Sequence, residues 1–269
     1  MKIINDIDTM KKWRNKGKKI AFVPTMGGLH QGHLLLVELA KENADRVVVS
    51  IFVNPTQFGE GEDFTDYPRT VEADLALLQV QGVDCVFMPS VEAIYPNGMA
   101  LDVKVGEIGG ILCGKTRPHF FNGVVQVVER LLEIVRPDVA VFGQKDYQQL
   151  HIIRQFTLAG SDPEIEIIAG KIMREKDGLA MSTRNQYLSV DERNIAPQLY
   201  KTLHQLHQGE LDRKSASRQL QHYFKLDYLE MLDANTLKQI TDNTSKIAIL
   251  CAVFLGSTRL IDNIIFKRG

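Results

Sequence analysis

The chain has 269 residues, of which 44% are hydrophobic and 24% charged, and its formal net charge is −1 at pH 7. This composition is typical of a globular protein with one large or two modest domains. A net charge so close to zero provides no field that would hold a polyanion, so we expect neither nucleic acid nor a membrane to be the main partner.

Three cysteines, Cys85, Cys113 and Cys251, stand far apart and form no C-x-x-C pair. They predict neither a disulfide framework nor a zinc site, and such a set is typical of the reducing cytosol. The first residues mix acids with apolar side chains and lack the apolar region of a secretion signal. The longest apolar run, 247–255, is too short to cross a bilayer. We therefore expect a cytoplasmic protein.

Strands and helices are predicted to alternate along the first part of the chain. A short amphipathic helix is expected at 5–16. Apolar strands are expected at 20–23, 46–52, 84–88 and 139–142, and further helices after residue 30, at 70–81 and at 123–135. This alternation predicts a doubly wound parallel α/β domain, which is Rossmann-like, over residues 1–171.

The pattern changes at residue 172. A charged segment at 172–184 predicts a hinge, and Ser189 and Glu192 form a capping-box pattern for a helix that Pro197 is expected to kink. A second short helix and three strand-like segments near 226–232, 246–255 and 260–266 follow. We expect a smaller α+β domain over residues 172–269.

Two histidines stand where a predicted helix follows a buried strand and a glycine turn. The glycines of this stretch, A-F-V-P-T-M-G-G-L-H-Q-G-H, fit neither the dinucleotide-binding fingerprint nor the P-loop. His30 and His33 are three residues apart, so both rings lie on one face of the first helical turn. Backbone N–H groups, the helix dipole and both rings could bind a phosphate there. A single histidine at such a place more often only caps the helix, but the agreement of strand, glycines and histidine spacing favours an anion site.

Polar side chains also follow two other predicted parallel strands. Asn54 and Gln57 lie in N-P-T-Q-F, and Lys145 lies with Asp146 in G-Q-K-D-Y-Q-Q. Open α/β sheets bind ligands at the carboxyl ends of their strands. Taken alone, the amides are more often turn residues, and the lysine beside an aspartate is more often a solvated helix cap. At the end of a parallel strand, Lys145 is instead well placed to neutralise a phosphate.

Several segments together resemble one family. P-T-M-G-G-L-H-Q-G-H resembles the H-x-G-H signature of the adenylate-forming nucleotidyltransferases and, in its longer form, the signature of the pantothenate synthetases (pantoate–β-alanine ligases). N-P-T-Q-F, F-G-Q-K-D-Y-Q-Q-L and R-E-K-D-G-L-A-M-S-T-R-N-Q-Y-L resemble further motifs of that family, as do Y-P-R-T, I-V-R-P-D and T-R-L-I-D-N. The resemblance spans nearly the whole chain.

The resemblance implies a two-step ligase reaction. The carboxylate of pantoate attacks the α-phosphate of Mg-ATP, which gives pantoyl adenylate and pyrophosphate. The amine of β-alanine then attacks the acyl carbon, which releases AMP and pantothenate. The protein would act mainly by positioning and charge stabilisation. The resemblance also implies a homodimer built on the larger domain, with the smaller domain closing over the nucleotide.

The resemblance further implies roles for individual residues, with His33 as the proton donor and with His30 and Lys145 as the other catalytic residues. The residues implied to bind ATP are Met26, Gly27, Gly28, Leu29, His30, Gln31, Gly32, His33, Gly143, Gln144, Lys145, Asp146, Met173, Met181, Ser182, Thr183 and Arg184. The residues implied to bind the other substrates are Gln57, Gln149, Asn54 and Arg117. Asp74 is implied to help hold Mg²⁺, although a lone helical aspartate is more often only solvated. For Met26 and Met173 ordinary core packing is the alternative.

The chain departs from the family pattern at a few positions. Gln31 and Gln144 stand where the family commonly has glutamate, and Thr183 keeps the hydroxyl of the usual serine. Phe120 occupies the usual position of a histidine, with His119 one residue earlier, so the role of a histidine in that loop is not carried over.

Two other functions stay open. A different nucleotidyltransferase with the same core could adenylylate another acid or a mononucleotide. A regulatory module could bind a nucleotide without turnover. The presence of both histidines, Lys145 and the glutamines Gln57 and Gln149 favours an enzyme, because binding alone would not require the full set.

Overall fold

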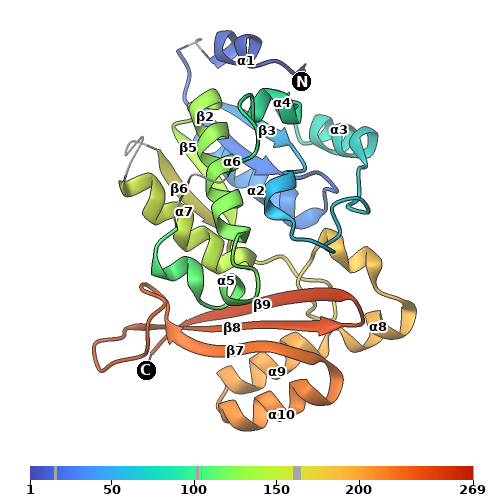
Figure 1. Cartoon of the computed structure of the whole chain (residues 1–269), viewed down its shortest axis with the longest axis vertical. Helices are drawn as coiled ribbons and strands as arrows, with labels where there is room; N and C mark the ends of the chain where they lie inside the picture. The colour runs from blue at the N-terminus through green and yellow to red at the C-terminus, as the bar shows by residue number, and fades with distance from the viewer. Residues whose placement is uncertain (15–16, 101–102, 104, 160–164, 269) are drawn as a thin grey trace. The chain divides into compact units, whose positions relative to one another are not determined.

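The structure is a computed structural model that describes residues 1–14, 17–100, 103, 105–159 and 165–268 (Figure 1). The chain divides into two compact units. The first unit comprises Met1–Gln144 and Gln148–Lys171, and the second comprises Lys145–Tyr147 and Ile172–Gly269. Residues 15 and 16 of the helix predicted at 5–16 lie outside the described residues.

The first unit contains a six-stranded parallel sheet. Its strands are β1 (Lys2–Ile4), β2 (Ile20–Thr25), β3 (Arg46–Ile51), β4 (Cys85–Phe87), β5 (Val139–Gly143) and β6 (Glu166–Gly170), in the order β1-β4-β3-β2-β5-β6. The order reverses direction at β2, which lies between β3 and β5, and such a switch point is where open α/β sheets bind ligands. The helix after β2 therefore begins at this point.

Helices cover both faces of this sheet. They are α1 (Ile7–Arg14), α2 (Gln31–Asn43), α3 (Val71–Val80), α4 (Val91–Ile94), α5 (Cys113–Thr116), α6 (Phe120–Val135) and α7 (Tyr147–Ala159), with 3-10 turns η1 (Pro55–Gln57), η2 (Glu107–Gly110) and η3 (Gln144–Asp146). Alternate strand residues face opposite sides: Phe22 and Val48 pack in a core with α6, whereas Val23 and Val49 pack in a core with α2. Burial on both faces explains the continuous apolar character of these strands.

The second unit contains a three-stranded antiparallel sheet in the order β7-β8-β9, with helices packed on it. Its elements are η4 (Thr183–Tyr187), α8 (Val190–Ile195), α9 (Gln198–His207), α10 (Arg213–Tyr223), β7 (Lys225–Asp233), β8 (Lys246–Leu255) and β9 (Thr258–Lys267). Ser189 and Glu192 form the expected capping box, and the helix is interrupted at Pro197, between α8 and α9. One apolar core joins α9, α10 and the sheet.

The parallel sheet of the first unit and the antiparallel sheet of the second confirm the predicted fold class, a Rossmann-like α/β domain followed by a smaller α+β domain. The edge strands β1 and β6 are not among the strands that the sequence predicts, because one has only three residues and the other is only partly buried. The charged segment at 172–184 contains a tight turn closed by a bridge between Arg174 and Ala180, and its role as a hinge stays a prediction. Within the described part of the chain, no helix combines the length and apolar character needed to cross a membrane.

The paired glycines of β5 and β6 allow a test of the packing of α2 on the sheet. A Cβ atom at Gly170 would lie 2.1 Å from Leu36 Cδ2, whereas at Gly143 the nearest atom is 4.0 Å away. Leu36 is buried, so it cannot turn aside freely. We expect Gly170→Ala to lower the free energy of unfolding by about 1–3 kcal/mol, and Gly143→Ala to change it by less than about 1 kcal/mol.

Urea unfolding followed by tryptophan fluorescence would measure this difference in the first unit, because Trp13 is the one tryptophan of the sequence. Equal unfolding midpoints for the two variants would contradict the packing of Leu36 against Gly170.

Candidate functional site

The turn between β2 and α2 is held by a buried carboxylate. Asp74 of α3 accepts hydrogen bonds from the backbone N–H of Gly28 at 2.9 Å and of Leu29 at 2.8 Å, and from the hydroxyl of Thr70 at 3.2 Å. Gly27 and Gly28 have φ of 81° and 61°, which glycine adopts without steric cost. Asp74 therefore determines the path of the backbone that leads into the histidines.

Asp74 does not fit the predicted role of a magnesium ligand. Its side chain is 1% exposed, and both of its oxygens accept backbone N–H groups. Mg²⁺ requires near-octahedral oxygen coordination and usually keeps several waters, which a carboxylate enclosed in this way does not provide. Among the residues that the structure describes, no group of three or more His, Cys, Asp or Glu side chains is placed to hold a metal ion.

His30 and His33 cap the helix that they begin. Nδ1 of His30 accepts a hydrogen bond from the backbone N–H of Gly32 at 3.1 Å, and Nδ1 of His33 accepts one from the N–H of His30 at 3.3 Å. The two ring centroids are 4.1 Å apart. A ring nitrogen that accepts a hydrogen bond carries no proton, so each neutral ring carries its proton on Nε2. The capping bonds thus determine the tautomer.

Backbone N–H groups of this turn are already used within the protein. Gly27 donates to the hydroxyl of Thr25 at 3.2 Å, and the next two N–H groups donate to Asp74. These N–H groups thus have partners within the protein, and their predicted binding of an anion stays a prediction. The donor suited to an anion is Nε2–H, at the far end of each imidazole ring of His30 and His33.

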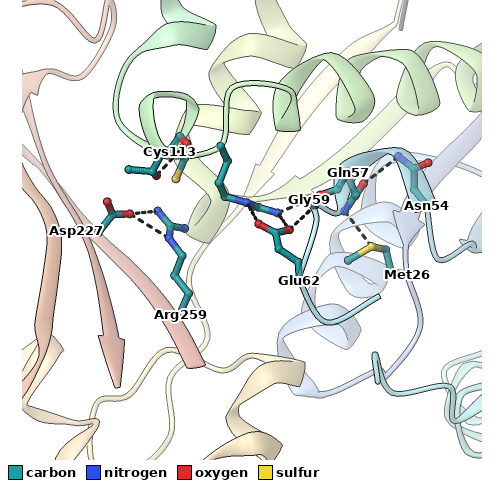
Figure 2. A network of polar contacts seen from close by, with 10 residues as sticks. Met26, Asn54, Gln57, Gly59, Glu62, Cys113, Asp227 and Arg259 are labelled. Carbon is teal, nitrogen blue, oxygen red and sulfur yellow. Dashed lines mark hydrogen bonds and ion pairs between the residues drawn. The ribbon is translucent and has the colours of Figure 1, made fainter. Parts of the chain in front are cut away.

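A buried amide network orients Gln57 (Figure 2). Asn54 is 1% exposed, and its Nδ2 donates to Gln57 Oε1 at 3.2 Å and to the carbonyl of Gly123 at 3.1 Å. Its Oδ1 accepts from the hydroxyl of Tyr95 at 2.7 Å, and burial raises the pKa of Tyr95, which keeps this donor protonated. Because Asn54 binds Oε1, the orientation of the Gln57 amide is fixed, and its donor group Nε2 lies 2.9 Å from Met26 Sδ. Asn54 thus orients the side chain expected to bind substrate.

Arg117 holds the segment after Gln57. Its Nε donates to Glu62 Oε1 at 2.6 Å, and its Nη2 donates to Glu62 Oε2 at 2.5 Å and to the carbonyl of Gln57 at 3.0 Å. The guanidinium lies over the ring of Phe120, 3.8 Å from its centroid. Phe120, which stands where the resemblance leads us to expect histidine, therefore provides a stacking surface for Arg117. In this structure Arg117 thus binds Glu62 and Gln57, and its contact with substrate stays a prediction.

Lys145 of η3 packs with the second unit. Its carbonyl accepts a hydrogen bond from Asn263 Nδ2 at 3.0 Å. Burial lowers the pKa of the Lys145 ammonium; the charges of Asp146 and Asp262 act in the opposite direction, and that of Arg184 adds to the lowering. The second unit therefore brings several charged groups to the predicted phosphate ligand.

The small hydroxyl residues at the start of η4, Ser182 and Thr183, also belong to the second unit. Ser182 caps η4, its Oγ accepting from the N–H of Arg184 at 3.3 Å, and Thr183 is buried. The backbone N–H of Met181 donates to the carbonyl of Met173 at 2.9 Å, so the backbones of these two predicted ATP-binding residues are hydrogen-bonded to each other.

Two adjacent glutamines at the start of α7 differ in their surroundings. Gln148 is buried and its amide bonds the N–H of Cys113 and the carbonyls of Ile108 and Ile111. Gln149, the predicted substrate residue, is only half-buried. Gln148 thus has a structural role, as have Glu62, Tyr95 and Gly123, none of which is predicted from the sequence. Their contacts join segments far apart along the chain, and local sequence patterns carry no signal for such contacts.

Comparisons with known proteins cover almost the entire chain. The family model for pantoate-beta-alanine ligase matches residues 2–265. A pantothenate synthetase of Ruthia magnifica is 60% identical over 97% of this chain and 95% of its own length, and one of Fervidobacterium nodosum is 48% identical over 99% and 100%.

Solved structures give the same result. The crystal structure of pantothenate synthetase from Thermus thermophilus superposes with a TM-score of 0.91 at 40% identity, covering 98% of this chain and 99% of that one. A pantoate-beta-alanine ligase from Francisella tularensis, complexed with beta-gamma ATP and beta-alanine, gives 0.86 at 36% identity, covering 98% and 97%.

The anchoring role of Asp74 can be separated from metal binding. Asp74→Asn replaces one acceptor oxygen by a donor that faces a backbone N–H, so we expect the free energy of unfolding to fall by about 1–3 kcal/mol. Glu72→Gln, an exposed change in the same helical turn, is the matched control and should have little effect. We also expect Mg²⁺ alone to shift the melting temperatures of the wild type and of Asp74→Asn equally. A Mg²⁺-dependent stabilisation that only the wild type shows would assign the metal to Asp74 after all.

Proposed function

The chain belongs to the pantoate–β-alanine ligase family, and on that premise we propose that it condenses pantoate with β-alanine at the expense of ATP. The pantoate carboxylate attacks the α-phosphate of ATP, which forms pantoyl adenylate and releases pyrophosphate. The β-alanine amine attacks the acyl carbon, which forms pantothenate and releases AMP and a proton. The observation that carries the proposal is the family match over residues 2–265.

His30 and His33 are proposed to stabilise the charge that develops on the phosphates as pyrophosphate leaves, with His33 as the proton donor. The geometry supports this role because each Nδ1 accepts a backbone hydrogen bond and each Nε2 then carries a hydrogen. Capping also holds both rings in place before the reaction, so little reorganisation accompanies charge development.

Gln57 and Gln149 are proposed to bind the hydroxyl and carboxylate of pantoate. Neutral amides orient an anion without holding it as tightly as a cation does, which suits a carboxylate that must act as a nucleophile. Asn54 supports the site by orienting the amide of Gln57, and Arg117 supports it through the carbonyl of Gln57.

Lys145, Ser182, Thr183 and Arg184 of the second unit are proposed to bind the phosphates of the same ATP, with this unit closing over the nucleotide. The remaining ATP contacts are assigned to residues 26–33 and 143–146, with Met173 and Met181.

Because burial lowers the pKa of Lys145, its ammonium loses the proton at a lower pH than an ordinary lysine does. Activity that depends on this charge should therefore decline on the alkaline side.

Mg²⁺ is proposed to enter with ATP, bound by phosphate oxygens, since Asp74 does not fit as its ligand. A homodimer built on the first unit and a cytoplasmic location are part of the same proposal and rest on the family resemblance and the composition.

Isotope exchange between ATP and pyrophosphate tests the first step without β-alanine. We expect exchange that depends on pantoate, because only formation of the adenylate makes pyrophosphate release reversible. Exchange with other carboxylates but not with pantoate would indicate a different nucleotidyltransferase. ATP binding without exchange for any acid would indicate a regulatory module.

Replacement of His33 tests its catalytic role. We expect His33→Ala to lower turnover by about 10²–10³, the usual cost of losing one transition-state donor. His33→Asn is the matched variant, since its short amide can replace the Nδ1 acceptor of the cap but places no donor where Nε2 stands. We expect the same loss of turnover with a melting temperature closer to that of the wild type. A loss below tenfold in both variants would refute the assigned role.

A further inference from the structure

The motif T-R-L-I-D-N has no part in the proposed chemistry, yet it forms the buried portion of β9 at residues 258–263. Three of its side chains make long-range polar contacts. Arg259 bonds Asp227 of β7, Asp262 bonds Arg174, and Asn263 bonds the backbone of Lys145. All of these residues belong to the second unit.

Asn263 determines where the backbone of Lys145 lies. Asn263 is 2% exposed, and its Nδ2 donates to the carbonyl of Lys145 at 3.0 Å. Lys145 leaves the end of β5 in the short turn η3, and the Tyr147 hydroxyl gives the same segment a second attachment by donating to the carbonyl of Ala234 at 2.8 Å. The segment Lys145–Tyr147 is therefore attached to the rest of the second unit at two points.

Asp262 is a buried carboxylate with a rigid partner. Its side chain is 1% exposed and accepts two hydrogen bonds from Arg174, at 2.6 and 2.9 Å. Arg174 is itself held by the carbonyl of Gly178 at 3.1 Å and by the ring of Tyr200, whose centroid lies 3.8 Å from the guanidinium carbon. A bidentate pair of this kind has little freedom to rearrange.

Asp262 opposes the effect of burial on Lys145. Burial lowers the pKa of Lys145, Arg184 of η4 lowers it further, and the negative charges of Asp146 and Asp262 raise it. Burial also raises the pKa of Asp262, whereas its two bonds to Arg174 favour the ionised carboxylate. Asp262 Oδ1 also accepts the backbone N–H of Asn263 at 2.7 Å, so the carboxylate is bonded to the residue that holds the Lys145 carbonyl. Asp146 lies in the same turn as Lys145, so Asp262 is the opposing charge that another element supplies.

We propose that Asp262 and Asn263 are positioning residues for Lys145, with Asn263 fixing its backbone and the carboxylate of Asp262 balancing its ammonium charge. This inference rests on the proposed role of Lys145 in binding the phosphates of ATP. It gives the last strand of the chain a part in nucleotide binding, although the strand itself need not touch ATP.

Asp262→Asn keeps the shape of the side chain and removes its charge. We expect kcat/KM for ATP, measured by pantoate-dependent exchange, to fall at least about tenfold more at about pH 9 than at about pH 7, because Lys145 then deprotonates more readily. Asp227→Asn is the matched control, since it breaks another buried Asp–Arg pair of this sheet, and Asp227 is not among the charges that act on Lys145. Its pH profile should follow that of the wild type.

Lys145→Arg supplies a cation that stays charged at all relevant pH values. When Asp262→Asn is added to Lys145→Arg, the extra alkaline loss should disappear. A purely structural role for Asp262 would instead give a loss that does not depend on pH and is the same in both backgrounds. That result would overturn the charge-balancing part of the inference.

Asn263→Ala tests the backbone contact and carries the test alone if Asp262→Asn does not fold, as judged by circular dichroism. We expect KM for ATP to rise about tenfold while KM for pantoate changes little and the pH profile is unchanged. An unchanged KM for ATP would overturn the inference. Failure of the proposed function would look different, since the wild type would then show no pantoate-dependent exchange.

Discussion

The start of α2 depends on a buried carboxylate that must be satisfied by the backbone around it. Asp74 accepts the N–H groups of Gly28 and Leu29 and so holds the glycine turn that leads to His30, the N-cap residue of α2. The two rings then use Nδ1 to complete the helix cap, which leaves the proton of each neutral ring on Nε2. Helix capping and the proposed phosphate chemistry are therefore two uses of the same histidines, one for each ring nitrogen, and they do not compete.

In the second unit, a cation is likewise surrounded by polar partners whose own positions are held. Lys145 follows β5 in the chain, but its turn is bonded to residues of the second unit, and the buried pair of Asp262 and Arg174 belongs to the same polar group. A buried charge is tolerated when rigid partners balance it. The proposed phosphate ligands Lys145 and Arg184 thus lie within one unit, and the charges that act on Lys145 come from η3, η4 and β9.

Local patterns carried much of the prediction. The apolar strands 46–52 and 139–142, the capping box of Ser189 and Glu192 and the interruption at Pro197 each depend on neighbours a few residues apart, and each is present in the structure. The same reasoning missed the edge strands β1 and β6. It also could not show the partners of Asp74 and Asn54 inside the protein, because an acidic or amide side chain beside a predicted site shows its chemistry but not its partners.

By itself, the sequence determined the alternation of elements, the family and the residue types that carry the chemistry, since spacing and order are local properties. Only the tertiary structure decided how those residues are used. Asp74 lies 46 residues from the glycine that it anchors, Tyr95 lies 41 residues from Asn54, and Asn263 lies 118 residues from Lys145. A buried polar group must find a partner, but which partner it finds depends on the path of the whole chain, because packing brings distant segments together.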